Sequence, residues 1–581
     1  MRQQYAWRSM VLNGFLAFVA TLIVLQMVRI QASAEAVQFR EQANAFAGEY
    51  KTFYPERGEI YDRNGHLLAG NKTVYEVGVD LTAIRDPHSI AMAVSVNLGK
   101  NYDEIYSEIL NPPAGISYLV LDTQAPSDVV DYLKELKKEL NASDNPTPSL
   151  VGLEFSPRLA RSYPEDALAS NVLGFVNMEG RGYFGVEEKY NDLLAGNSVQ
   201  VWVPSDPNRA VEIPRIPNGT SLILTINRDL QDAVEEILDQ SLYEYGAQHG
   251  AIIVMNPQNG EILAMASTPR MDLNNFQNYG VIYNNASEFN RATGMPYEPG
   301  SVMKIFTMAA ALDTGLVAPD TTFLDTGEFQ IGGVTIKNWD EQAWGLQTMV
   351  GCLQHSLNVC MTWLATQLGP QNFYEYMNRF GFGSLTGLDM AGEAAGRLKI
   401  PGDADWYPVD LGTNSFGQGV SATPLQIMTG ASAIANQGHM VTPHVLYAML
   451  RDGHQFNYPS QYAGTPIKAE TAATLTGMLA ASLEYESSAA LVPGYRVAGK
   501  TGTAQIPTPF GFYDSSQTNA SFIGWGPVDD PQFMVYVWLE RPTTSIWGSE
   551  TAAPVFSEVA QKTVILLDIP PDSVRLQMVT R

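Results

Sequence analysis

The sequence predicts an α+β protein in which the C-terminal domain, residues 220–581, has an α/β-type sheet with helices on both faces. Three observations lead to this prediction. Apolar strand patterns occur at both ends of that segment, apolar residues recur at helical spacing between them, and a long uncharged apolar run lies at the N-terminus. A chain of 581 residues also exceeds one ordinary domain, so at least two domains are expected.

The N-terminal run is predicted to cross a membrane once. Residues 10–28 carry no charged side chain and are long enough to span a bilayer core. A cleaved signal peptide is the alternative, because an A-x-A-like site follows, but the run is longer than most signal-peptide cores. Two preceding arginines favour a cytoplasmic tail at residues 1–9. We therefore expect an anchor at residues 10–30 with the remaining chain outside the cytoplasm.

The first domain outside the membrane is expected to cover residues 31–219. Alternating apolar and polar residues around Asn64-Gly65 predict a β-hairpin. Two prolines within residues 211–221 are typical of a linker to the next domain. Three charged residues near the hairpin are interpreted as members of structural ion pairs: Arg57, Asp62 and Arg63.

The domain at residues 220–581 is expected to build its sheet from both ends of the segment. Its predicted helices are residues 228–245 and 554–568. Its predicted strands, which include one hairpin across a Pro-Gln-Asn-Gly turn, are residues 221–226, 251–256, 261–267, 496–506, 520–527 and 532–540.

Charge and cysteine content exclude several functional classes. Acidic residues outnumber basic ones by 61 to 35, and this balance argues against nucleic-acid binding. Cys352 and Cys360 are predicted to lie on one continuous helix, about 12 Å apart along its axis. That separation is too long for a disulfide, so we expect two small buried apolar residues. No C-x-x-C pair indicates a zinc site, and neither a metal nor a cofactor is implied.

The stretch GYRVAGKTGTAQ, residues 494–505, fits two motifs. From Gly494 it matches the phosphate-binding loop of ATPases, and from Lys500 it matches the K-T-G motif of penicillin-recognising serine enzymes. A phosphate-binding loop needs a helix that begins at the Lys-Thr pair. Pro507 and Pro509 prevent such a helix, so the segment is predicted to be a strand that carries K-T-G.

Two further motifs complete the pattern. Ser301 follows a Pro-Gly break at the start of an apolar helix, and Lys304 lies one turn later on the same face. Burial lowers the pKa of a lysine and makes it a base that can activate a serine. Ser356-Leu357-Asn358 follows as an S-x-N motif, which is expected on a helix end or an inter-helix turn. Each motif alone is weak, but their order within one domain predicts serine acyl-transfer chemistry.

Other residues near these motifs receive structural interpretations. His355 precedes Ser356, but no G-x-S-x-G element accompanies it, so a Ser-His-Asp triad is not expected. Four aromatic residues could rim a cleft, and core packing is the preferred interpretation for each: Trp339, Trp344, Phe416 and Tyr513.

With these motifs in place, the sequence resembles the class B penicillin-binding proteins, which are bitopic, monofunctional peptidoglycan D,D-transpeptidases. The resemblance implies an elongated pedestal domain followed by a transpeptidase domain related to serine β-lactamases. The YEPGS and TGLDMAGEAAG segments are closer to the division-type branch than to the elongation-type branch. The similar segments span nearly the whole chain: residues 57–69, 161–176, 185–196, 297–301, 417–426, 500–505 and 553–556.

The resemblance also implies roles for individual residues. Ser301 would be the acylated nucleophile and Lys304 its general base, while Ser356 would relay a proton to the leaving group. Asn358 would hold Lys304 and the substrate amide. Lys500 would be a catalytic residue that sets the electrostatics around Ser356 and the substrate carboxylate. Thr501 and Thr503 would hydrogen-bond that carboxylate or the peptide backbone, and Gly502 would let the substrate approach the strand closely. The backbone N–H groups of Ser301 and Thr503 would form the oxyanion hole.

The resemblance finally implies substrates and partners. The substrate would be a stem peptide ending in D-Ala-D-Ala, and β-lactams would acylate the same serine. A SEDS-family glycosyltransferase and other membrane proteins of the division or elongation machinery would be partners. Three alternatives stay open: an elongation-type transpeptidase, a β-lactam-binding sensor, and a hydrolase such as a D,D-carboxypeptidase or β-lactamase.

Overall fold

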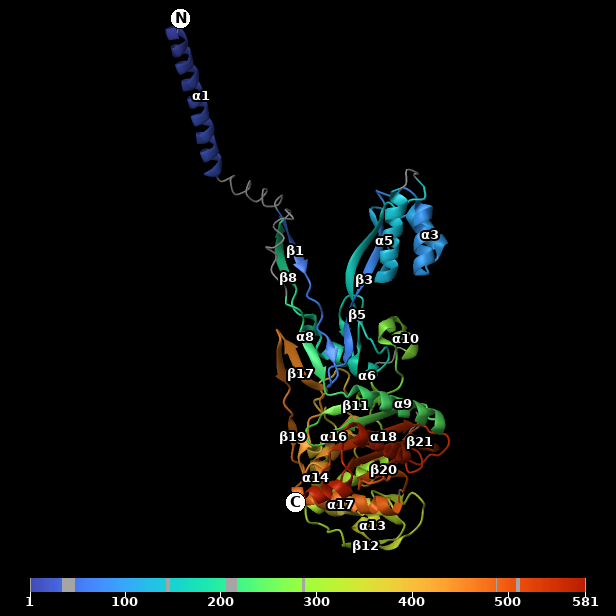
Figure 1. Cartoon of the computed structure of the whole chain (residues 1–581). Helices are drawn as coiled ribbons and strands as arrows, with labels where there is room; N and C mark the ends of the chain where they lie inside the picture. The colour runs from blue at the N-terminus through green and yellow to red at the C-terminus, as the bar shows by residue number, and fades with distance from the viewer. Residues whose placement is uncertain are drawn as a thin grey trace. The chain divides into compact units, whose positions relative to one another are not determined.

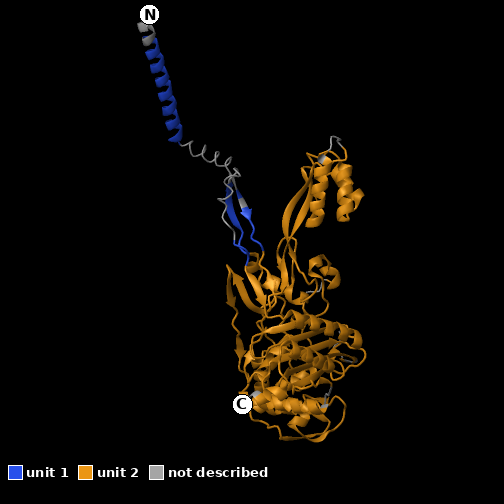
Figure 2. Cartoon of the chain, in the orientation of Figure 1, with its two compact units in different colours: residues 1–56, 196–219 blue, residues 57–195, 220–581 orange. Residues whose placement is uncertain are grey.

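A computed structural model of the chain describes residues 2–33, 48–142, 147–204, 217–284, 288–486, 488–507 and 513–579. It contains two compact units, which Figure 2 colours separately. The first unit combines residues 1–56 with 196–219, and the second combines residues 57–195 with 220–581. The domain boundaries expected from the sequence, 31–219 and 220–581, stay predictions.

The first unit holds the apolar N-terminal helix. Helix α1 covers Arg2–Gln31, and an 18-residue window within its segment Trp7–Gln31 has a mean hydropathy of 2.2 and no buried residue. It is long and apolar enough to cross a membrane, which fits the predicted single-pass anchor. Strands β1 (Gly48–Phe53) and β8 (Val199–Pro204) pair antiparallel in the same unit. Most of the expected linker lies outside the described residues.

In the second unit, the predicted hairpin at Asn64-Gly65 is confirmed. Strand β2 (Ile60–Tyr61) pairs antiparallel with β3 (Leu67–Asp80), and Gly65 takes a φ of +90° in the turn. Strand β3 also pairs with two later strands, and helices cover the sheet they form, as the labels of Figure 1 show. These elements are α3 (Pro87–Leu98), α4 (Tyr102–Leu110), β4 (Tyr118–Pro126), α5 (Ser127–Asn141) and β5 (Leu153–Ser162).

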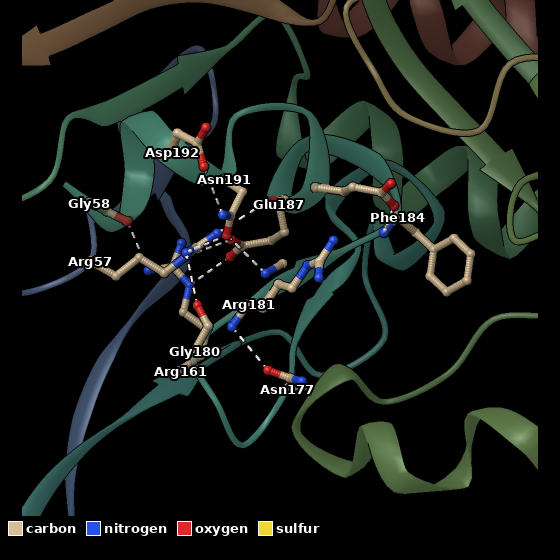
Figure 3. Close-up of polar contacts among 12 residues, drawn as sticks. Arg57, Gly58, Arg161, Asn177, Gly180, Arg181, Phe184, Glu187, Asn191 and Asp192 are labelled. Atoms are coloured by element: carbon tan, nitrogen blue, oxygen red, sulfur yellow. Dashed lines mark hydrogen bonds and ion pairs between the residues drawn. The ribbon is translucent and has the colours of Figure 1, made fainter. Parts of the chain in front are cut away.

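A buried cluster of charges lies beside the hairpin. The carboxylate of Glu187 accepts hydrogen bonds from Arg57 Nε at 2.8 Å and from Arg161 Nε at 2.7 Å. Figure 3 shows both guanidinium groups pointing at this carboxylate. Glu187 is fully buried, so losing either arginine would leave a poorly paired charge in the interior. Arg63 pairs with Glu261 at 3.5 Å, and the ion-pair interpretation is confirmed for Arg57 and Arg63.

Asp62 is also structural, but it binds mainly backbone groups. Its Oδ1 accepts from the N–H groups of Asn64 and His66, both at 2.8 Å, and its Oδ2 accepts from the N–H of Arg228 at 3.1 Å. Burial opposes ionisation of this carboxyl group, but the backbone hydrogen bonds outweigh burial and lower the pKa of Asp62 below its ordinary value. Asp62 therefore links the hairpin to the start of a helix 166 residues later.

A seven-stranded sheet joins the hairpin to the later part of the chain. Strand β2 pairs parallel with β9 (Ser221–Leu224), which pairs antiparallel with β17 (Leu446–Arg451). Strand β18 (His454–Asn457) completes one edge, and β4 and β5 flank β3 at the other end. The segment around residue 60 and the segment around residue 222 thus belong to one sheet.

The second large sheet has five antiparallel strands in the order β11-β10-β22-β21-β20. The strands expected from the sequence are confirmed: β10 (His249–Met255), β11 (Ile262–Ser267), β20 (Ala498–Pro507), β21 (Tyr513–Gly526) and β22 (Phe533–Glu540). Strand β20, which carries the K-T-G motif, lies at an edge of this sheet.

Successive apolar side chains of β22 point to opposite faces of the sheet, and helices cover both faces. Residues such as Val535 and Val537 pack with α9 (Arg228–Tyr245) and α18 (Ala552–Leu566), whereas Tyr536 and its alternate neighbours enter a separate cluster with the central helices. A strand with both faces buried reads as a continuous apolar run, as here. The expected α+β fold class is confirmed.

The remaining elements lie in the second unit. They are α6 (Ser170–Leu173), β6 (Phe175–Val176), β7 (Gly182–Tyr183), α7 (Gly185–Lys189), α8 (Asn191–Ala195), η2 (Leu273–Asn278), α10 (Tyr279–Ile282), α11 (Arg291–Gly294), η3 (Gly300–Met303), α12 (Lys304–Asp313), β12 (Thr322–Asp325), β13 (Glu328–Ile331), β14 (Val334–Lys337), β15 (Gly345–Thr348), α13 (Met349–Gln354), α14 (Asn358–Arg379), α15 (Pro408–Asn414), α16 (Pro424–Ala435), β16 (Met440–Val441), β19 (Tyr462–Gly464), α17 (Ala469–Glu486), η4 (Ser488–Ala490) and α19 (Asp572–Val579).

Candidate active site

Ser301 and Lys304 lie where a short 3₁₀ turn, η3, passes into helix α12. Gly300 begins the turn with a φ of +58°, and a Cβ at this position would lie 2.8 Å from the carbonyl oxygen of Thr503. A glycine is required because the turn packs directly against strand β20. Lys304 begins helix α12 and is fully buried.

Ser356 lies in a sharp turn between helices α13 and α14. It takes a φ of +53°, which is left-handed backbone and uncommon for a residue with a side chain. The turn brings the Cα atoms of Cys352 and Cys360 to 6.1 Å, and the two cysteines form a disulfide. The prediction of one continuous helix between the cysteines and of two separate thiols is therefore wrong, whereas the turn expected at the S-x-N motif is confirmed. The chain reverses at Ser356, so the distance along a helix axis does not apply.

Lys304 connects the first two motifs. Its Nζ donates to Ser356 Oγ at 3.1 Å and also to the Ser356 carbonyl oxygen. A lysine amine within hydrogen-bond distance of a serine hydroxyl can pass protons to and from it. Asn358 Nδ2 donates to the carbonyl oxygen of Lys337 at 3.1 Å. The expected roles of Asn358 toward Lys304 and substrate stay predictions.

The K-T-G residues form part of strand β20, and no helix begins at Lys500-Thr501. This confirms that the match to a phosphate-binding loop is accidental. Lys500 is buried and donates through Nζ to Thr501 Oγ1 at 3.1 Å. Thr501 and Thr503 are half-buried, whereas the residues between and beside them are buried. The two threonines therefore share the exposed face of the edge strand.

Residue 502 has to be a glycine because neighbouring residues leave no room for a side chain, in addition to the space that an approaching substrate would need. A Cβ at this position would lie 2.2 Å from Ser521 Oγ on β21 and 3.1 Å from the carbonyl oxygen of Pro299. The strand thus contacts both its neighbour in the sheet and the residues just before Ser301. This contact places the K-T-G motif beside Ser301.

One cavity of about 310 Å³ brings the motifs together. Residues from all three motifs line it: Ser301, Ser356, Lys500, Thr501 and Thr503. Lys304 contacts the cavity wall through Ser356, and Lys500 adds positive charge. Serine hydroxyls, a buried amine and an edge strand that carries a lysine surround one space, and groups of these types can perform acyl transfer to and from a substrate that carries a carboxylate.

Two tryptophans also line the cavity: Trp339 and Trp547. Core packing was expected for Trp339, but the side chain is 50% exposed and its Nε1 donates to the carbonyl oxygen of His355 at 3.0 Å. Trp547 was not singled out in the sequence, because no motif surrounds it. A signal was present in the cluster Trp547-Gly548-Ser549 between a strand and a helix, where loops that carry function often lie.

The other aromatic residues have separate roles. Phe416 is buried in the core as expected. Tyr513 is 42% exposed, and its hydroxyl donates to the carboxylate of Glu298. Burial raises the pKa of this carboxyl group, which lies three residues before Ser301. Trp344 stacks on His355 with ring centroids 3.9 Å apart.

His355 itself is not placed for a triad. It lies between Trp344 and the turn of Ser356, and burial lowers the pKa of its imidazole. No group of three or more His, Cys, Asp or Glu side chains within the described residues is arranged to hold a metal ion.

Two known protein families match different parts of the chain. Residues 250–561 match the family described as the penicillin-binding protein transpeptidase domain, and residues 52–211 match the penicillin-binding protein dimerisation domain. All three sequence motifs fall within the first match. The second match covers the charge cluster around Glu187.

Individual relatives cover most of the chain. Stage V sporulation protein D of Bacillus subtilis is 32% identical over 532 residues, which cover 89% of this chain and 79% of that protein. The peptidoglycan D,D-transpeptidase FtsI of Escherichia coli K12 is 26% identical over 578 residues, which cover 98% and 93%. The crystal structure of penicillin-binding protein 3 from Mycobacterium tuberculosis with aztreonam has a TM-score of 0.69 and 26% identity, covering 90% and 98%. The chain therefore belongs to the class B penicillin-binding proteins.

Proposed function

We propose that this protein is a membrane-anchored peptidoglycan D,D-transpeptidase that cross-links stem peptides through an acyl-serine intermediate. One observation carries the proposal: the cavity lined by Ser301, Ser356 and the K-T-G threonines, with Lys304 Nζ 3.1 Å from Ser356 Oγ. The residues that would serve as nucleophile, proton carrier and carboxylate-binding groups thus line one cavity or contact its wall. The names of the relatives support the same reaction.

In the acylation step, Ser301 Oγ attacks the carbonyl carbon of the penultimate D-alanine, and its proton passes to Lys304. The backbone N–H groups of Ser301 and Thr503 would stabilise the oxyanion. Lys500, Thr501 and Thr503 would bind the terminal carboxylate. The proton then passes through Ser356 to the nitrogen of the terminal D-alanine, the C–N bond breaks, and D-alanine leaves the acyl-enzyme.

In the transfer step, an amine of a second stem peptide attacks the ester carbonyl. A new C–N bond forms, the bond to Ser301 Oγ breaks, and the proton of the amine returns to Ser301 through Ser356. A β-lactam would acylate the same oxygen, but its leaving group stays tethered, so it would keep the acceptor out. Penicillin would therefore form a persistent adduct.

The cellular setting is part of the proposal. Helix α1 would hold the protein in the cytoplasmic membrane with the catalytic domain outside the cytoplasm. The disulfide between Cys352 and Cys360 supports a location of the catalytic domain outside the cytoplasm, because disulfides persist in oxidising compartments. Similarity to FtsI favours a role in division rather than elongation. A SEDS-family glycosyltransferase in the same membrane is the proposed partner.

The test is the intact mass of the full chain in detergent after incubation with penicillin. We expect one added penicillin mass in the wild type and none in Ser301→Ala. Ser107→Ala, which removes an exposed hydroxyl outside the cavity, is the matched control and should be acylated like the wild type. A folded wild-type protein without an adduct would refute the proposed nucleophile and reaction.

The lifetime of the adduct separates the alternatives. An adduct that persists for hours excludes a β-lactamase. A D,D-carboxypeptidase would instead release D-alanine and then hydrolyse the acyl-enzyme with water, and it would never transfer the acyl group to an amine. An adduct without any turnover of peptide or thioester donors would indicate a sensor.

A further inference from the structure

The segment that leads to Ser301 crosses one face of the five-stranded sheet. Tyr297 contacts β22, the central strand, where its ring centroid lies 5.5 Å from that of Trp538. Two residues later, the carbonyl oxygen of Pro299 lies 3.1 Å from the position that a Cβ on Gly502 would take, and Gly502 belongs to the edge strand β20. The chain therefore passes over β21, from the centre of the sheet to its edge, just before it reaches Ser301.

Small residues beneath this segment let it lie directly on the sheet. Gly502 on β20 is paired in register with Ser521 on β21, and Ser521 is paired with Trp538 on β22. Gly300 touches the edge strand as well, since its Cβ position lies 2.8 Å from the carbonyl oxygen of Thr503. A small displacement of this segment would therefore move Ser301 relative to the K-T-G motif.

A buried pair of tyrosine hydroxyls holds the inner end of the segment. The hydroxyl groups of Tyr297 and Tyr536 are hydrogen-bonded to each other. Tyr536 is fully buried on β22, and Tyr297 is 6% exposed. Burial raises the pKa of Tyr297 to about 12 and raises the pKa of Tyr536 well above its ordinary value, so both hydroxyls stay neutral at physiological pH. One hydroxyl therefore donates to the other in the interior of the domain.

Tyr297 is also held on its other side and along its ring. Its N–H donates to the carbonyl oxygen of Ala422, and its own carbonyl oxygen accepts from the N–H of Ala422, both at 3.0 Å. The ring of Trp538, which packs on Tyr297, is fixed by a hydrogen bond from its Nε1 to Asn519 Oδ1 at 3.0 Å. Tyr297 is thus held in place four residues before Ser301, and its hydroxyl bond joins this part of the segment to the central strand.

The proposed reaction depends on the spacing that these contacts set. The oxyanion hole would take one N–H from Ser301 and one from Thr503, which belong to the crossing segment and to the edge strand beneath it. A misplacement of about 1 Å between reacting groups can lower a rate about a hundredfold. Neither Tyr297 nor Tyr536 is among the residues that line the cavity, so any effect of their bond on the reaction has to act through Ser301.

We propose that Tyr297 and Tyr536 are positioning residues for acylation, and that their hydrogen bond holds Ser301 at the distance from the K-T-G strand that the reaction requires. The proposal rests on the transpeptidase function above. A change from tyrosine to phenylalanine removes one oxygen and keeps the ring that packs on Trp538. The contribution of the bond can therefore be measured without removing the packing.

The test separates acylation from the binding that precedes it. The full chain in detergent reacts with the chromogenic cephalosporin nitrocefin over a range of concentrations on the pre-steady-state timescale. The dependence on concentration gives the dissociation constant of the noncovalent complex and the acylation rate constant of Ser301. We expect Tyr297→Phe and Tyr536→Phe each to lower the rate constant about tenfold and to change the dissociation constant less than about twofold, because the groups that would bind the carboxylate stay in place.

The double variant Tyr297→Phe/Tyr536→Phe distinguishes positioning from stability. Each single variant leaves one buried hydroxyl without its partner and should lower the Tm, whereas the double variant leaves no such hydroxyl and should regain much of the Tm. The hydrogen bond is absent in all three variants. The acylation rate constant should therefore stay about tenfold low in the double variant, with no further loss beyond the single variants.

Tyr376→Phe is the matched control. This hydroxyl is also buried, and it donates to Asp313 Oδ2 at 2.7 Å, at the opposite end of helix α12 from Lys304. Its removal should lower the Tm and leave the acylation rate constant unchanged. An equally slow Tyr376→Phe would show that loss of any buried hydroxyl slows acylation, and it would overturn the specific role of the tyrosine pair.

Wild-type rate constants in Tyr297→Phe and Tyr536→Phe would also overturn that role. So would recovery of the rate constant together with the Tm in the double variant, because the unpaired hydroxyl and not the lost bond would then be the cause. If one single variant does not fold, the other single variant and the double variant still decide between these results. A folded wild-type protein that neither penicillin nor nitrocefin acylates would instead refute the proposed function.

Discussion

At the scale of single residues, Gly502 and Gly548 allow backbone segments to meet beside Ser301. A Cβ at Gly548 would lie 2.2 Å from the carbonyl oxygen of Gly502 and 2.8 Å from that of Ser521. Both contacts are with backbone atoms, which cannot move aside as a flexible side chain can. The loop of Trp547 therefore packs on the K-T-G strand because residue 548 has no side chain.

Gly548→Ala should consequently damage both stability and acylation. The added methyl group must push the loop from β20 and stretch the bond between Gly548 N and Thr503 Oγ1, which costs about 1–3 kcal/mol for an overpacked site. We expect a lower Tm and at least a tenfold lower rate of penicillin acylation. Gly477→Ala is the control: no atom lies within 4 Å of its Cβ, and alanine favours helix α17 by about 0.5–1 kcal/mol. A wild-type acylation rate in Gly548→Ala would contradict this account.

The residues that could be predicted are those whose chemistry is encoded in short motifs. The proximity of Ser301, Ser356 and Lys500 follows from motif order, and the structure places all three around one cavity. Trp547 and Gly548 were missed because their importance comes from contacts with residues far away in the sequence, such as Trp339 and Thr503. Such contacts depend on tertiary packing, and single-sequence periodicity carries no information about them.

At the scale of elements, the turn between α13 and α14 is the largest difference from the sequence prediction. Apolar periodicity continues through Cys352, Leu353 and Leu357, so the pattern predicts one helix. The structure breaks it at Ser356 with left-handed backbone. Several contacts hold this turn: Lys304 and Trp339 donate to its carbonyl oxygens, and the Cys352–Cys360 disulfide joins the flanking helices. A functional constraint thus overrides local helical preference.

Removing the disulfide should therefore affect catalysis as well as stability. Closing a loop of this length stabilises a fold by about 2–3 kcal/mol in the chain-entropy model. We expect the Cys352→Ala/Cys360→Ala double variant to show a lower Tm and slower penicillin acylation, because Ser356 would no longer be held in its strained turn. Treating the wild type with a thiol reductant should reproduce the effect, and the same reductant should not alter the double variant. If reduction lowers the Tm and leaves the acylation rate unchanged, the disulfide does not position Ser356.

At the scale of the whole molecule, the hairpin of β2 and β3 and the catalytic domain belong to one compact unit and share a sheet. Strand β2 pairs with β9 in the seven-stranded sheet, and Asp62 binds the backbone at the start of α9. The sequence predicted the individual strands, since alternation and turn residues mark them locally. It could not predict that residues near 60 and 222 share a sheet, because their pairing is parallel and has no turn to mark it.

This connection predicts a pH-dependent effect of Asp62→Asn on global unfolding. The substitution keeps the size of the side chain but turns one oxygen into an NH₂ group that faces the N–H of Arg228 or of Asn64 and His66. An unpaired buried donor costs about 1–3 kcal/mol, so the Tm should fall at pH 7 without a second transition. Because the folded-state pKa of Asp62 lies below its ordinary value of 3.8, its stabilising effect is present above that pH and is lost as the pH falls through the folded pKa.

The difference in Tm between wild type and Asp62→Asn should therefore shrink as the pH is lowered from 3.8. Thermal unfolding of the full chain in detergent, followed at pH 7 and in steps below pH 4, measures it. Asp131→Asn breaks an exposed ion pair with Lys134 and should change stability by less than about 1 kcal/mol at either pH. A Tm difference for Asp62→Asn that persists unchanged through the acid range would show that the carboxylate charge is not what joins the hairpin to α9. A split into two transitions would show that the shared sheet does not couple the two regions.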